Sequence, residues 1–557
     1  MKMLLTSVFG PFGVNDQYGE KENKMELFHN QVTREQGIFS YRFNHASHGL
    51  YFLAENIDVP TAVLDFPTLR RFKKELEKGY DYIGISFIIP TFEKAKKMAE
   101  LVRQISPDSK IVLGGHGVNI PNIENMIEHD FICHGDGISF LRDLFNEDQN
   151  KPIKHPQSYS SFNREVMGVP WASNSGILIT GVGCPNKCRF CATSHFFGGY
   201  ISYLKTGKEI FDVCCEYEDK IGITNFGVLD ENFLKAKDRA LELLEIMERE
   251  ERYFTFAIFS SAETLIDIGD PDILVRLGVD FIWIGVESKK EIYEKNKGVE
   301  FHHLFKELKR RGISIMTSSI LFLEDHDKET IWDDIKFATS LNADYLQFMQ
   351  LGPVPGTALY ENYKEEGKIL ADIPFLAQHG QKNIWFHHEH FTPDESNEFL
   401  KKAFIYDYQK NGPSLLRAIQ TSLQGYEYCV NHPDPKIKQR AGKFKSMLEV
   451  MRYFRFSSRI FCQNDAAKNM LTEIRKNYDR LLGKSTLKTF VLSLIFLLFS
   501  IKEYLKITFH TDVRQPKTLY KKINKGVLQS AEPLHLTAIT FRAMAAGELA
   551  TGCRKIK

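Results

Sequence analysis

Three cysteines lie close together in a chain that otherwise scatters its cysteines. The segment Gly183–Cys191 reads GCPNKCRFC, so Cys184, Cys188 and Cys191 are separated by three residues and then by two. Three thiolates from one short loop can hold three corners of an oxygen-sensitive 4Fe–4S cubane and leave one iron open for catalysis. Zinc is an alternative, but a structural site needs four ligands, and only His195 is near enough in sequence to be the fourth. Unliganded thiols are the third interpretation.

Alternating strand and helix patterns must position this loop. We expect six strands, at 175–180, 224–229, 254–260, 281–286, 314–322 and 345–350. Helical patterns lie between them, for example at 239–250 and 328–341. Six such units predict a (β/α) barrel, full or partial, with the cysteine loop at the carboxyl end of the first strand, where barrel enzymes carry their chemistry.

The cysteine spacing, the aromatic Phe190 and the following barrel resemble the radical S-adenosylmethionine superfamily. Weaker matches follow in the family's order along about Trp171–Phe391: 228–233 (VLDENF), 285–288 (GVES), 320–330 (ILFLEDHDKET) and 355–357 (PGT). The third departs from the family pattern, because the usual glycines are absent. The resemblance implies that the open iron binds S-adenosylmethionine and that one electron cleaves it to methionine and a 5′-deoxyadenosyl radical. The implied cofactor contacts are Phe190, Asp230, Glu287 and Ser288.

The region before the barrel has its own strand and helix alternation. Expected strands are 2–9, 61–66, 81–89, 110–113 and 130–133, with an amphipathic helix at 92–105. This order predicts a doubly wound, Rossmann-like sheet with glycines at its strand ends. Such a domain before the barrel resembles the cobalamin-binding subgroup. The resemblance implies cobalamin contacts at Ser86, Gly114, Gly115, His116 and Gly135.

A histidine ligand to cobalt is not expected, because the chain has no D-x-H-x-x-G motif. The domain then binds cobalamin without a histidine, or it is a structural or dimerising domain. Two other subgroups fit less well. Methylthiotransferases carry a second cluster on the first domain, where only Cys133 lies, and auxiliary-cluster enzymes have cysteine-rich carboxyl termini, whereas Cys429, Cys462 and Cys553 are isolated. Cys214 and Cys215 are expected in the core.

The 557 residues are too many for one hydrophobic core. We expect a cobalamin-binding Rossmann-like domain at 1–150, a radical S-adenosylmethionine barrel at 171–391 and a mainly helical region at 392–557, with a polar linker at Asn146–Ser161. The formal net charge of +1 argues against a nucleic-acid partner. Few cysteines and too short an apolar start for a signal peptide predict a cytoplasmic protein.

The carboxyl-terminal part contains an apolar run at Phe490–Ile501, shorter than the roughly 20 residues that a spanning helix needs. From Leu481 to Lys557 there are 13 Lys and Arg and 4 Asp and Glu, a local net charge of 13 − 4 = +9. We expect a buried helix packed on the barrel. The alternative is a basic amphipathic helix in peripheral contact with a membrane.

The resemblance thus implies a radical enzyme that removes a substrate hydrogen and transfers a methyl group from methylcobalamin to an unactivated carbon. Cobalamin-dependent cyclisation or rearrangement without methyl transfer is the second hypothesis, and a non-catalytic cobalamin or S-adenosylmethionine sensor is the third. Expected partners are a small-molecule or lipid-like substrate and a reductant such as flavodoxin or ferredoxin. The histidine-rich segment His387–His390 is interpreted as a surface or substrate-facing segment before a helix start at Thr392, rather than as a metal site.

Overall fold

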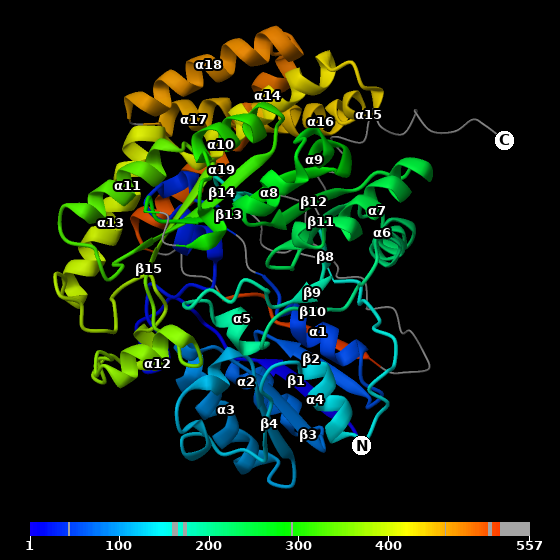
Figure 1. The fold of residues 1–557 in the computed structure, drawn as a ribbon, viewed down its shortest axis with the longest axis vertical. Helices are drawn as coiled ribbons and strands as arrows, with labels where there is room; N and C mark the ends of the chain where they lie inside the picture. Colours follow the sequence, from blue (N-terminus) through cyan, green and yellow to red (C-terminus); the bar gives the residue numbers. More distant parts are fainter. Residues whose placement is uncertain are drawn as a thin grey trace.

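The protein is described by a computed structural model that places residues 1–42, 45–158, 165–170, 175–290, 293–462, 464–510 and 515–523. Ser161 and Trp171, which bound the expected linker and barrel, lie outside these residues, as does everything from 524 onward. Two six-stranded sheets dominate the molecule, one in the lower half of Figure 1 and one in the upper half, and helices from the carboxyl-terminal part cover the top.

The amino-terminal sheet is doubly wound, as expected. Its parallel strands run in the order β2-β1-β3-β4-β5. They are β1 (Met3–Ser7), β2 (Thr61–Asp65), β3 (Tyr82–Ser86), β4 (Lys110–Gly114) and β5 (Phe131–Ile132). The helices are α1 (His48–Glu55), α2 (Leu69–Leu76), α3 (Phe92–Ile105) and α4 (Gly137–Leu144). Every residue of β1 and β2 is buried, which is why these strands read as continuous apolar runs rather than alternating patterns.

The second sheet is an open, partial barrel. Its six parallel strands pair in the order β15-β14-β13-β12-β11-β8, and β15 does not pair with β8. They are β8 (Gly176–Leu178), β11 (Asn225–Val228), β12 (Thr255–Phe259), β13 (Val279–Glu287), β14 (Ser314–Leu321) and β15 (Tyr345–Gln350). All six match the strands expected from the sequence. A short π-helix at Phe28–Val32 lies against β15, where Phe28 meets Tyr345 edge-on with ring centroids 5.3 Å apart.

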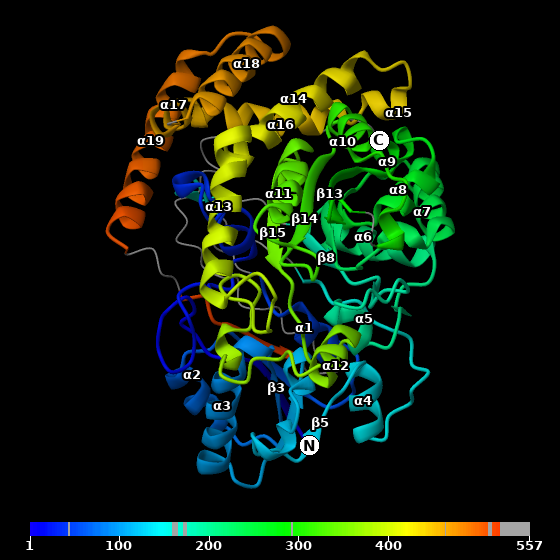
Figure 2. The same cartoon turned by 60° about the vertical axis from the view of Figure 1, so that its left-hand side comes forward.

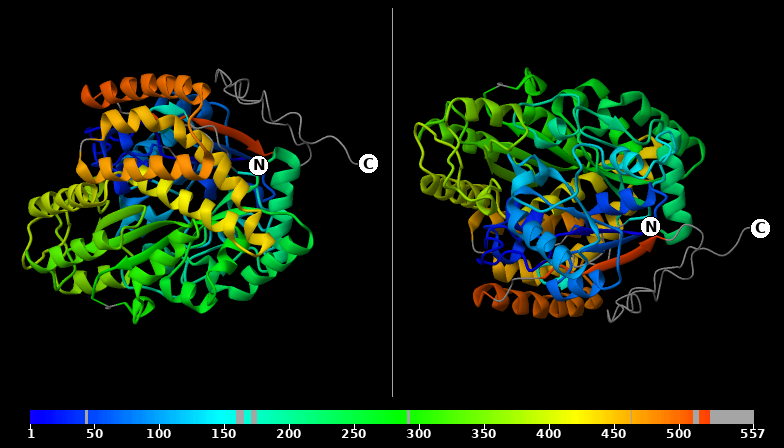
Figure 3. Two further views of the ribbon diagram at one scale, coloured as in Figure 1. Left: turned by 90° about the horizontal axis from the view of Figure 1, so that it is seen from above. Right: turned by 90° about the horizontal axis from the view of Figure 1, so that it is seen from below.

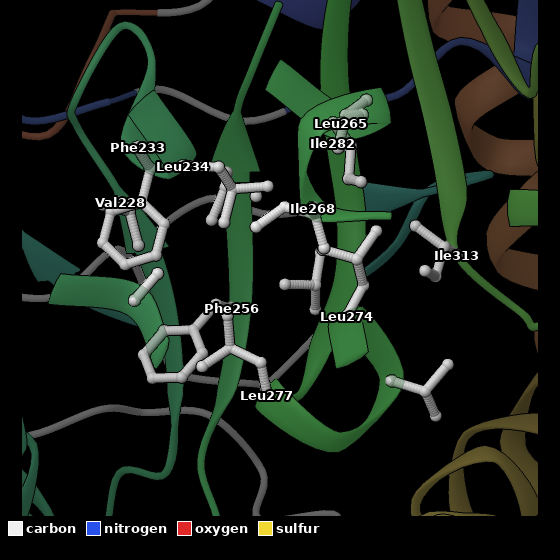
Figure 4. Packing of buried hydrophobic residues seen from close by; sticks show 14 of the residues in the cluster. Val228, Phe233, Leu234, Phe256, Leu265, Ile268, Leu274, Leu277, Ile282 and Ile313 are labelled. Carbon is white, nitrogen blue, oxygen red and sulfur yellow. The ribbon is translucent and has the colours of Figure 1, made fainter. Parts of the chain in front are cut away.

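Helices follow the barrel strands and cover the outer face of the sheet. They are α6 (Gly207–Ile221), α7 (Lys237–Arg249), α8 (Ala262–Ile268), α9 (Asp272–Leu277), α10 (Phe301–Arg310), α11 (Thr330–Ser340) and α12 (Ala358–Glu365). Figure 4 shows part of the core between them and the sheet, where Phe256 and Ile282 from the strands meet Leu265 and Leu274 from the helices. Cys214 is fully buried in this core and Cys215 is half-buried against it.

The carboxyl-terminal region is helical, as expected, and Figure 2 shows it wrapping over the top and one side of the barrel. The helices are α13 (Pro393–Asn411), α14 (Ser414–Asn431), α15 (Pro435–Lys438), α16 (Ala441–Met451), α17 (Arg455–Phe461), α18 (Asp465–Leu482) and α19 (Leu487–Thr508). A capping box between Thr392 and Glu395 starts α13, which confirms the predicted helix start.

Two features of this region differ from the sequence expectation. The chain returns to the amino-terminal sheet after α19, where β16 (Leu519–Ile523) pairs antiparallel with the edge of β2. The expected burial of the Phe490–Ile501 run is wrong, because Phe490, Val491, Leu494, Leu498 and Ile501 are all exposed. Among the described residues, no helix combines the length and apolar character needed to cross a membrane.

Candidate active site

A small hairpin fixes the loop that carries the three cysteines. The loop leaves β9 (Gly181–Val182), which pairs with β10 (Ile201–Ser202), and ends at α5 (Ala192–Phe196). Gly183 has φ +77°, and a Cβ there would lie 1.8 Å from the carbonyl oxygen of Gly199, so only glycine fits. The backbone N–H of Cys191 donates to the carbonyl of Cys188 at 2.9 Å, which turns the loop back on itself.

The three thiols are half-buried on this loop. Burial raises the pKa of the Cys184 and Cys188 thiols, and the ammonium of Lys295 partly offsets the shift at Cys188. Thiolates beside a positive charge are suited to bind metal. The donor set therefore fits an iron–sulfur cluster, which needs deprotonated cysteines.

A single metal ion at this loop would need ligands that converge on one point. Among the residues that the structure describes, no group of three or more His, Cys, Asp or Glu side chains converges on one ion position. A cubane bonds each cysteine to a different iron, so its thiolates lie farther apart than the ligands of one zinc ion. His195 is also engaged, since its Nδ1 lies 2.9 Å from the carbonyl oxygen of Cys191.

Two neighbouring carboxylates at the end of β11 have different environments. Asp230, the expected cofactor contact, is buried and accepts hydrogen bonds from Thr180 at 2.7 Å, Tyr200 at 2.7 Å and Arg239 at 2.9 Å. Its carboxylate is therefore occupied by the protein and braces the strand ends.

Glu231 has a carboxylate that can still accept a hydrogen bond from a ligand. This residue was not among those expected from the sequence. Its Oε2 is buried without a hydrogen-bond partner among the described residues. Burial raises the pKa of Glu231 to about 7, with the charge of Asp230 adding to the shift. The same carboxylate contributes to the raised pKa of the Cys184 thiol, which locates Glu231 beside the cysteine loop.

Glu287 and Lys295 form a buried ion pair on the other side of the loop. Glu287 ends β13 with φ +63°, next to a register shift against β14. Its Oε1 lies 2.5 Å from Nζ of Lys295, and their side chains are 7% and 15% exposed. Burial lowers the pKa of Lys295, but the facing carboxylate outweighs this effect and raises it above its ordinary value. No motif in the sequence pointed to Lys295.

Ser288, the neighbour of Glu287, is engaged in hydrogen bonds within the protein. Its Oγ donates to Asp334 of α11 at 2.8 Å, and Asp334 also contacts Nε2 of His326 at 2.9 Å. The structure thus gives Ser288 a bracing contact between a strand end and a helix.

A cavity of about 650 Å³ lies between the two sheets. Phe190 of the cysteine loop, Glu287 of β13 and Ser318 of β14 line it from the barrel. Phe66, Ile88 and Pro90, which follow β2 and β3, line it from the amino-terminal sheet. The strand order reverses between β1 and β3, and such a switch point is where doubly wound sheets bind ligands.

Residues from 23–31 and 45–47 line the remaining side of the cavity. Gln31 accepts a hydrogen bond from Gln347 of β15 at 2.8 Å, while Glu26 lines the cavity and pairs with Arg42 at 2.9 Å. The side chains of Glu20, His379 and Lys382 make a further polar cluster, in which Nζ of Lys382 lies 2.8 Å from Glu20. The cavity is of the size that holds drug-sized ligands, about 300–1,000 Å³.

The expected cobalamin loops lie beside the cysteine loop but do not line the cavity. His116 stacks on Phe196 of α5 with ring centroids 4.5 Å apart, and its Nε2 has no hydrogen-bond partner among the described residues. A Cβ on Gly115 would lie 2.5 Å from the carbonyl oxygen of Phe87, and one on Gly135 would touch the backbone of Phe196. Gly114 and Ser86 pair at the ends of β4 and β3. Since a corrin is much larger than a drug-sized ligand, these loops accommodate cobalamin only if α5 separates from them.

The side chains of the histidine-rich segment have different environments. Nε2 of His388 donates to the carbonyl of Leu323 at 2.9 Å, and burial lowers its pKa. His390 is exposed beside Glu389. His388 is thus buried, whereas His387, Glu389 and His390 lie at the surface.

Comparisons with known proteins identify the class of the barrel. Residues 178–338 match the family model described as the radical SAM superfamily. An uncharacterized methyltransferase of Pyrococcus horikoshii is 28% identical over 247 residues, or 43% of this chain and 51% of that protein. The bacteriochlorophyllide d C-8(2)-methyltransferase of Chlorobaculum tepidum is 24% identical over 54% of this chain and 72% of its own length. The match thus spans only about half of the first relative.

Another relative is named for a different reaction. The anaerobic magnesium-protoporphyrin IX monomethyl ester cyclase of Rubrivivax gelatinosus is 20% identical over 52% of this chain and 60% of its own length. The solved structure of the radical S-adenosylmethionine methyltransferase TsrM from Kitasatospora setae aligns with a TM-score of 0.49 and 15% identity, covering 81% of this chain and 99% of that one. Residues 178–338 thus carry a radical SAM superfamily domain, as the cysteine motif predicted, and methyltransferases are among the proteins similar to this chain.

Proposed function

We propose that the protein is a radical S-adenosylmethionine enzyme whose cluster is held by Cys184, Cys188 and Cys191. The observation that carries the proposal is one fixed loop with three half-buried thiols, whose Phe190 lines a cavity between two sheets. When bound, the cluster supplies the electron that cleaves the cosubstrate to methionine and a 5′-deoxyadenosyl radical. All other contributions below come from side chains of this chain.

Glu231 and Lys295 are suited to hold the amino-acid end of the cosubstrate. Glu231 offers a buried, unpartnered carboxylate oxygen that can accept from an ammonium. Lys295 offers an ammonium close enough to Cys188 to shift its pKa, and it can donate to a carboxylate while Glu287 fixes its position. The binding of a cation beside Glu231 also favours the ionised form of this carboxyl group.

The cluster assignment is tested with anaerobically purified protein. We expect about four irons per chain and formation of 5′-deoxyadenosine with a strong reductant. Replacing Cys188 by Ala should remove both. The matched control is Cys215→Ala, which removes a half-buried thiol outside the loop and should leave iron content unchanged. Cleavage activity that survives in Cys188→Ala sinks the assignment.

The proposed reaction is methyl transfer to an unactivated carbon of a small-molecule or lipid-like substrate. Its support is that two relatives, at 28% and 24% identity, carry methyltransferase names. Bound cobalamin would supply a methyl group that a substrate radical can take up. Radical cyclisation is the second candidate, because one relative is named as a cyclase. A product heavier by one deuterated methyl group, made from methyl-deuterated cosubstrate, separates the two. A sensor without turnover would release no 5′-deoxyadenosine.

We propose that cobalamin binds at the switch point of the amino-terminal sheet, without a histidine ligand, after α5 has moved away from His116 and Gly135. The support is that Ile88 and Pro90 face the barrel at this point, while His116 is held in a stack with Phe196. Protein incubated with hydroxocobalamin should retain it through gel filtration, with a spectrum that lacks an imidazole ligand. Ile88→Arg should abolish retention, while Met126→Arg, at a similarly exposed apolar residue of the same sheet domain, should not. If the wild-type protein retains no corrin, this domain is structural.

The remaining expectations stay proposals. A flavodoxin- or ferredoxin-type reductant would supply the electron, and no nucleic acid is needed. The pattern of unpaired cysteines favours a reducing, cytoplasmic setting.

A further inference from the structure

Helix α19 is amphipathic, but it is oriented with its polar side toward the protein. Its fully buried residues are Thr489, Ser493, Phe496, Ser500 and Glu503, four of which are polar. Its exposed apolar residues are Leu487, Phe490, Val491, Leu494, Leu498, Ile501, Tyr504, Leu505 and Phe509, the last of which caps the helix. A surface helix of a globular protein normally buries its apolar stripe. The apolar side of α19 is therefore left exposed among the described residues.

Polar contacts fix this orientation. Oγ of Ser500 donates to the carbonyl of Met167 at 2.9 Å and lies 2.9 Å from Oγ of Ser457. Glu503 is 4% exposed and pairs with Arg42 at 3.7 Å. Burying these groups without partners would be costly, so turning the helix over would break bonds that the present arrangement satisfies.

The exposed stripe is long and free of charge. No charged residue occurs from Thr489 to Ile501. The helix has 22 residues, which corresponds to about 33 Å at 1.5 Å per residue. Leu487 and Leu498 are 78% and 67% exposed, and the neighbouring helix α17 adds Ile460, which is 56% exposed. Figures 2 and 3 show α19 at the outer margin of the molecule, in agreement with the exposure of these side chains among the described residues.

The charges that flank the stripe are positive. Lys484, Lys488 and Lys502 are exposed, and Lys506 is half-buried near Glu503. By the helical repeat, Lys488 and Lys502 lie on one side of the stripe, about 80–120° around the helix from Leu494. The acidic residue of this helix, Glu503, is buried on the opposite side. A planar apolar surface with anionic groups at its edge complements this pattern.

We propose that α19 lies in the interface of an anionic phospholipid membrane, with its apolar stripe among the acyl chains and Lys488 and Lys502 at the headgroups. Apolar burial and attraction to anionic lipid act together in such helices. A second copy of the chain would bring the same lysines and no exposed acidic side chain of α19 to pair with them. Segment 524–557 has the same sign, with five Lys and Arg against two Asp and Glu. The membrane surface is the occupant whose charge fits.

The docked helix would be coupled to the candidate active site. Glu503 pairs with Arg42, and Arg42 pairs with Glu26, which lines the cavity. Arg42 thus links the cavity wall at Glu26 to the membrane-facing helix at Glu503. If the proposed radical chemistry holds, this arrangement favours a lipid-like substrate that enters from the bilayer, although membrane binding itself does not depend on that chemistry.

Flotation of the full-length protein with vesicles tests the proposal. The protein should float with phosphatidylcholine vesicles that contain 30% phosphatidylglycerol, and less so at high salt or without the anionic lipid. Leu494→Glu/Leu498→Glu should abolish flotation. Ile266→Glu is the matched control, because Ile266 is 52% exposed on α8 and lies outside the stripe. Lys488→Ala/Lys502→Ala should weaken binding about 30-fold, from about 1 kcal/mol per lysine.

The outcomes separate the alternatives. Equal flotation of wild type and Leu494→Glu/Leu498→Glu, or no flotation of either, overturns the proposal. So does a concentration-dependent dimer that the same substitutions dissociate in sedimentation without any vesicle binding. A chain that ends at Ile523 and gains flotation that the full-length chain lacks would identify 524–557 as the occupant instead. Iron content and 5′-deoxyadenosine formation should be unchanged in the α19 variants, so a failed radical chemistry would be recognised separately.

Discussion

Replacing Lys295 by Met separates its role in the fold from its role in binding the cosubstrate. The substitution leaves the Glu287 carboxylate, 7% exposed, without its partner at 2.5 Å. Removing one member of a buried ion pair costs about 3–5 kcal/mol of unfolding free energy, because the remaining charge stays buried. Adding Glu287→Gln removes that charge and should restore most of the loss. Urea unfolding under anaerobic conditions measures both values.

In Lys295→Met/Glu287→Gln, stability should be restored, but binding of S-adenosylmethionine should not. A charge-assisted hydrogen bond contributes about 1.5–3 kcal/mol, so the KM for S-adenosylmethionine in Lys295→Met/Glu287→Gln should rise about 10- to 150-fold. The matched control is Lys208→Met, since Lys208 pairs with Asp212 on the surface, where both side chains are more than half exposed. That change should cost less than about 1 kcal/mol and leave KM unchanged. A double variant with restored stability and a wild-type KM would refute the assignment of Lys295 to the cosubstrate.

Two further changes test the environment of the cysteine loop. Burial raises the pKa of Glu231 from 4.5 to about 7 in the folded protein. The native state therefore holds this proton more tightly than the unfolded chain does. The stability that proton binding contributes is lost as pH rises from about 4.5 through 7. Glu231→Gln should therefore stabilise the protein without cosubstrate by roughly 3 kcal/mol at pH 8 and very little at pH 4.5; equal unfolding free energies at pH 8 would contradict the burial argument. Gly183→Ala should prevent cluster assembly because its Cβ would lie 1.8 Å from the Gly199 carbonyl oxygen, whereas Gly442→Ala, with open space around it, should retain full iron content.

Sequence periodicity predicted the two sheets well because parallel strands buried on both faces leave a direct signal. All six barrel strands and the helix at 92–105 were found where the apolar runs placed them. The antiparallel strand β16 was not predicted. Its sequence, LYKKI, is short and basic, and its pairing depends on an edge of β2 that is remote in the chain.

The cysteine motif of the site was predicted from the sequence, but the charged side chains around it, Glu231 and Lys295, were not. The cysteine loop is recognisable because its chemistry depends on residue type and spacing alone. Glu231 was overlooked beside Asp230 because only the structure shows that Arg239 and two hydroxyl groups occupy the aspartate. Lys295 could not be found from spacing, since its position depends on the backbone turn at Glu287. The burial of α19 was predicted wrongly because periodicity identifies an apolar face but not the direction in which it points.

The pairing of β16 with β2 also has a consequence for folding during synthesis. Residue Thr61 pairs with Ile523, so the edge of the first sheet stays unpaired until nearly the whole chain has left the ribosome. At about 5–20 residues per second, the 523 − 61 = 462 intervening residues take roughly 20–90 s to make. During that time β2 presents a row of free backbone groups to other nascent chains. The newly made amino-terminal half should therefore depend on chaperones, and a chain that stops before Leu519 should aggregate through that edge even though its barrel is complete.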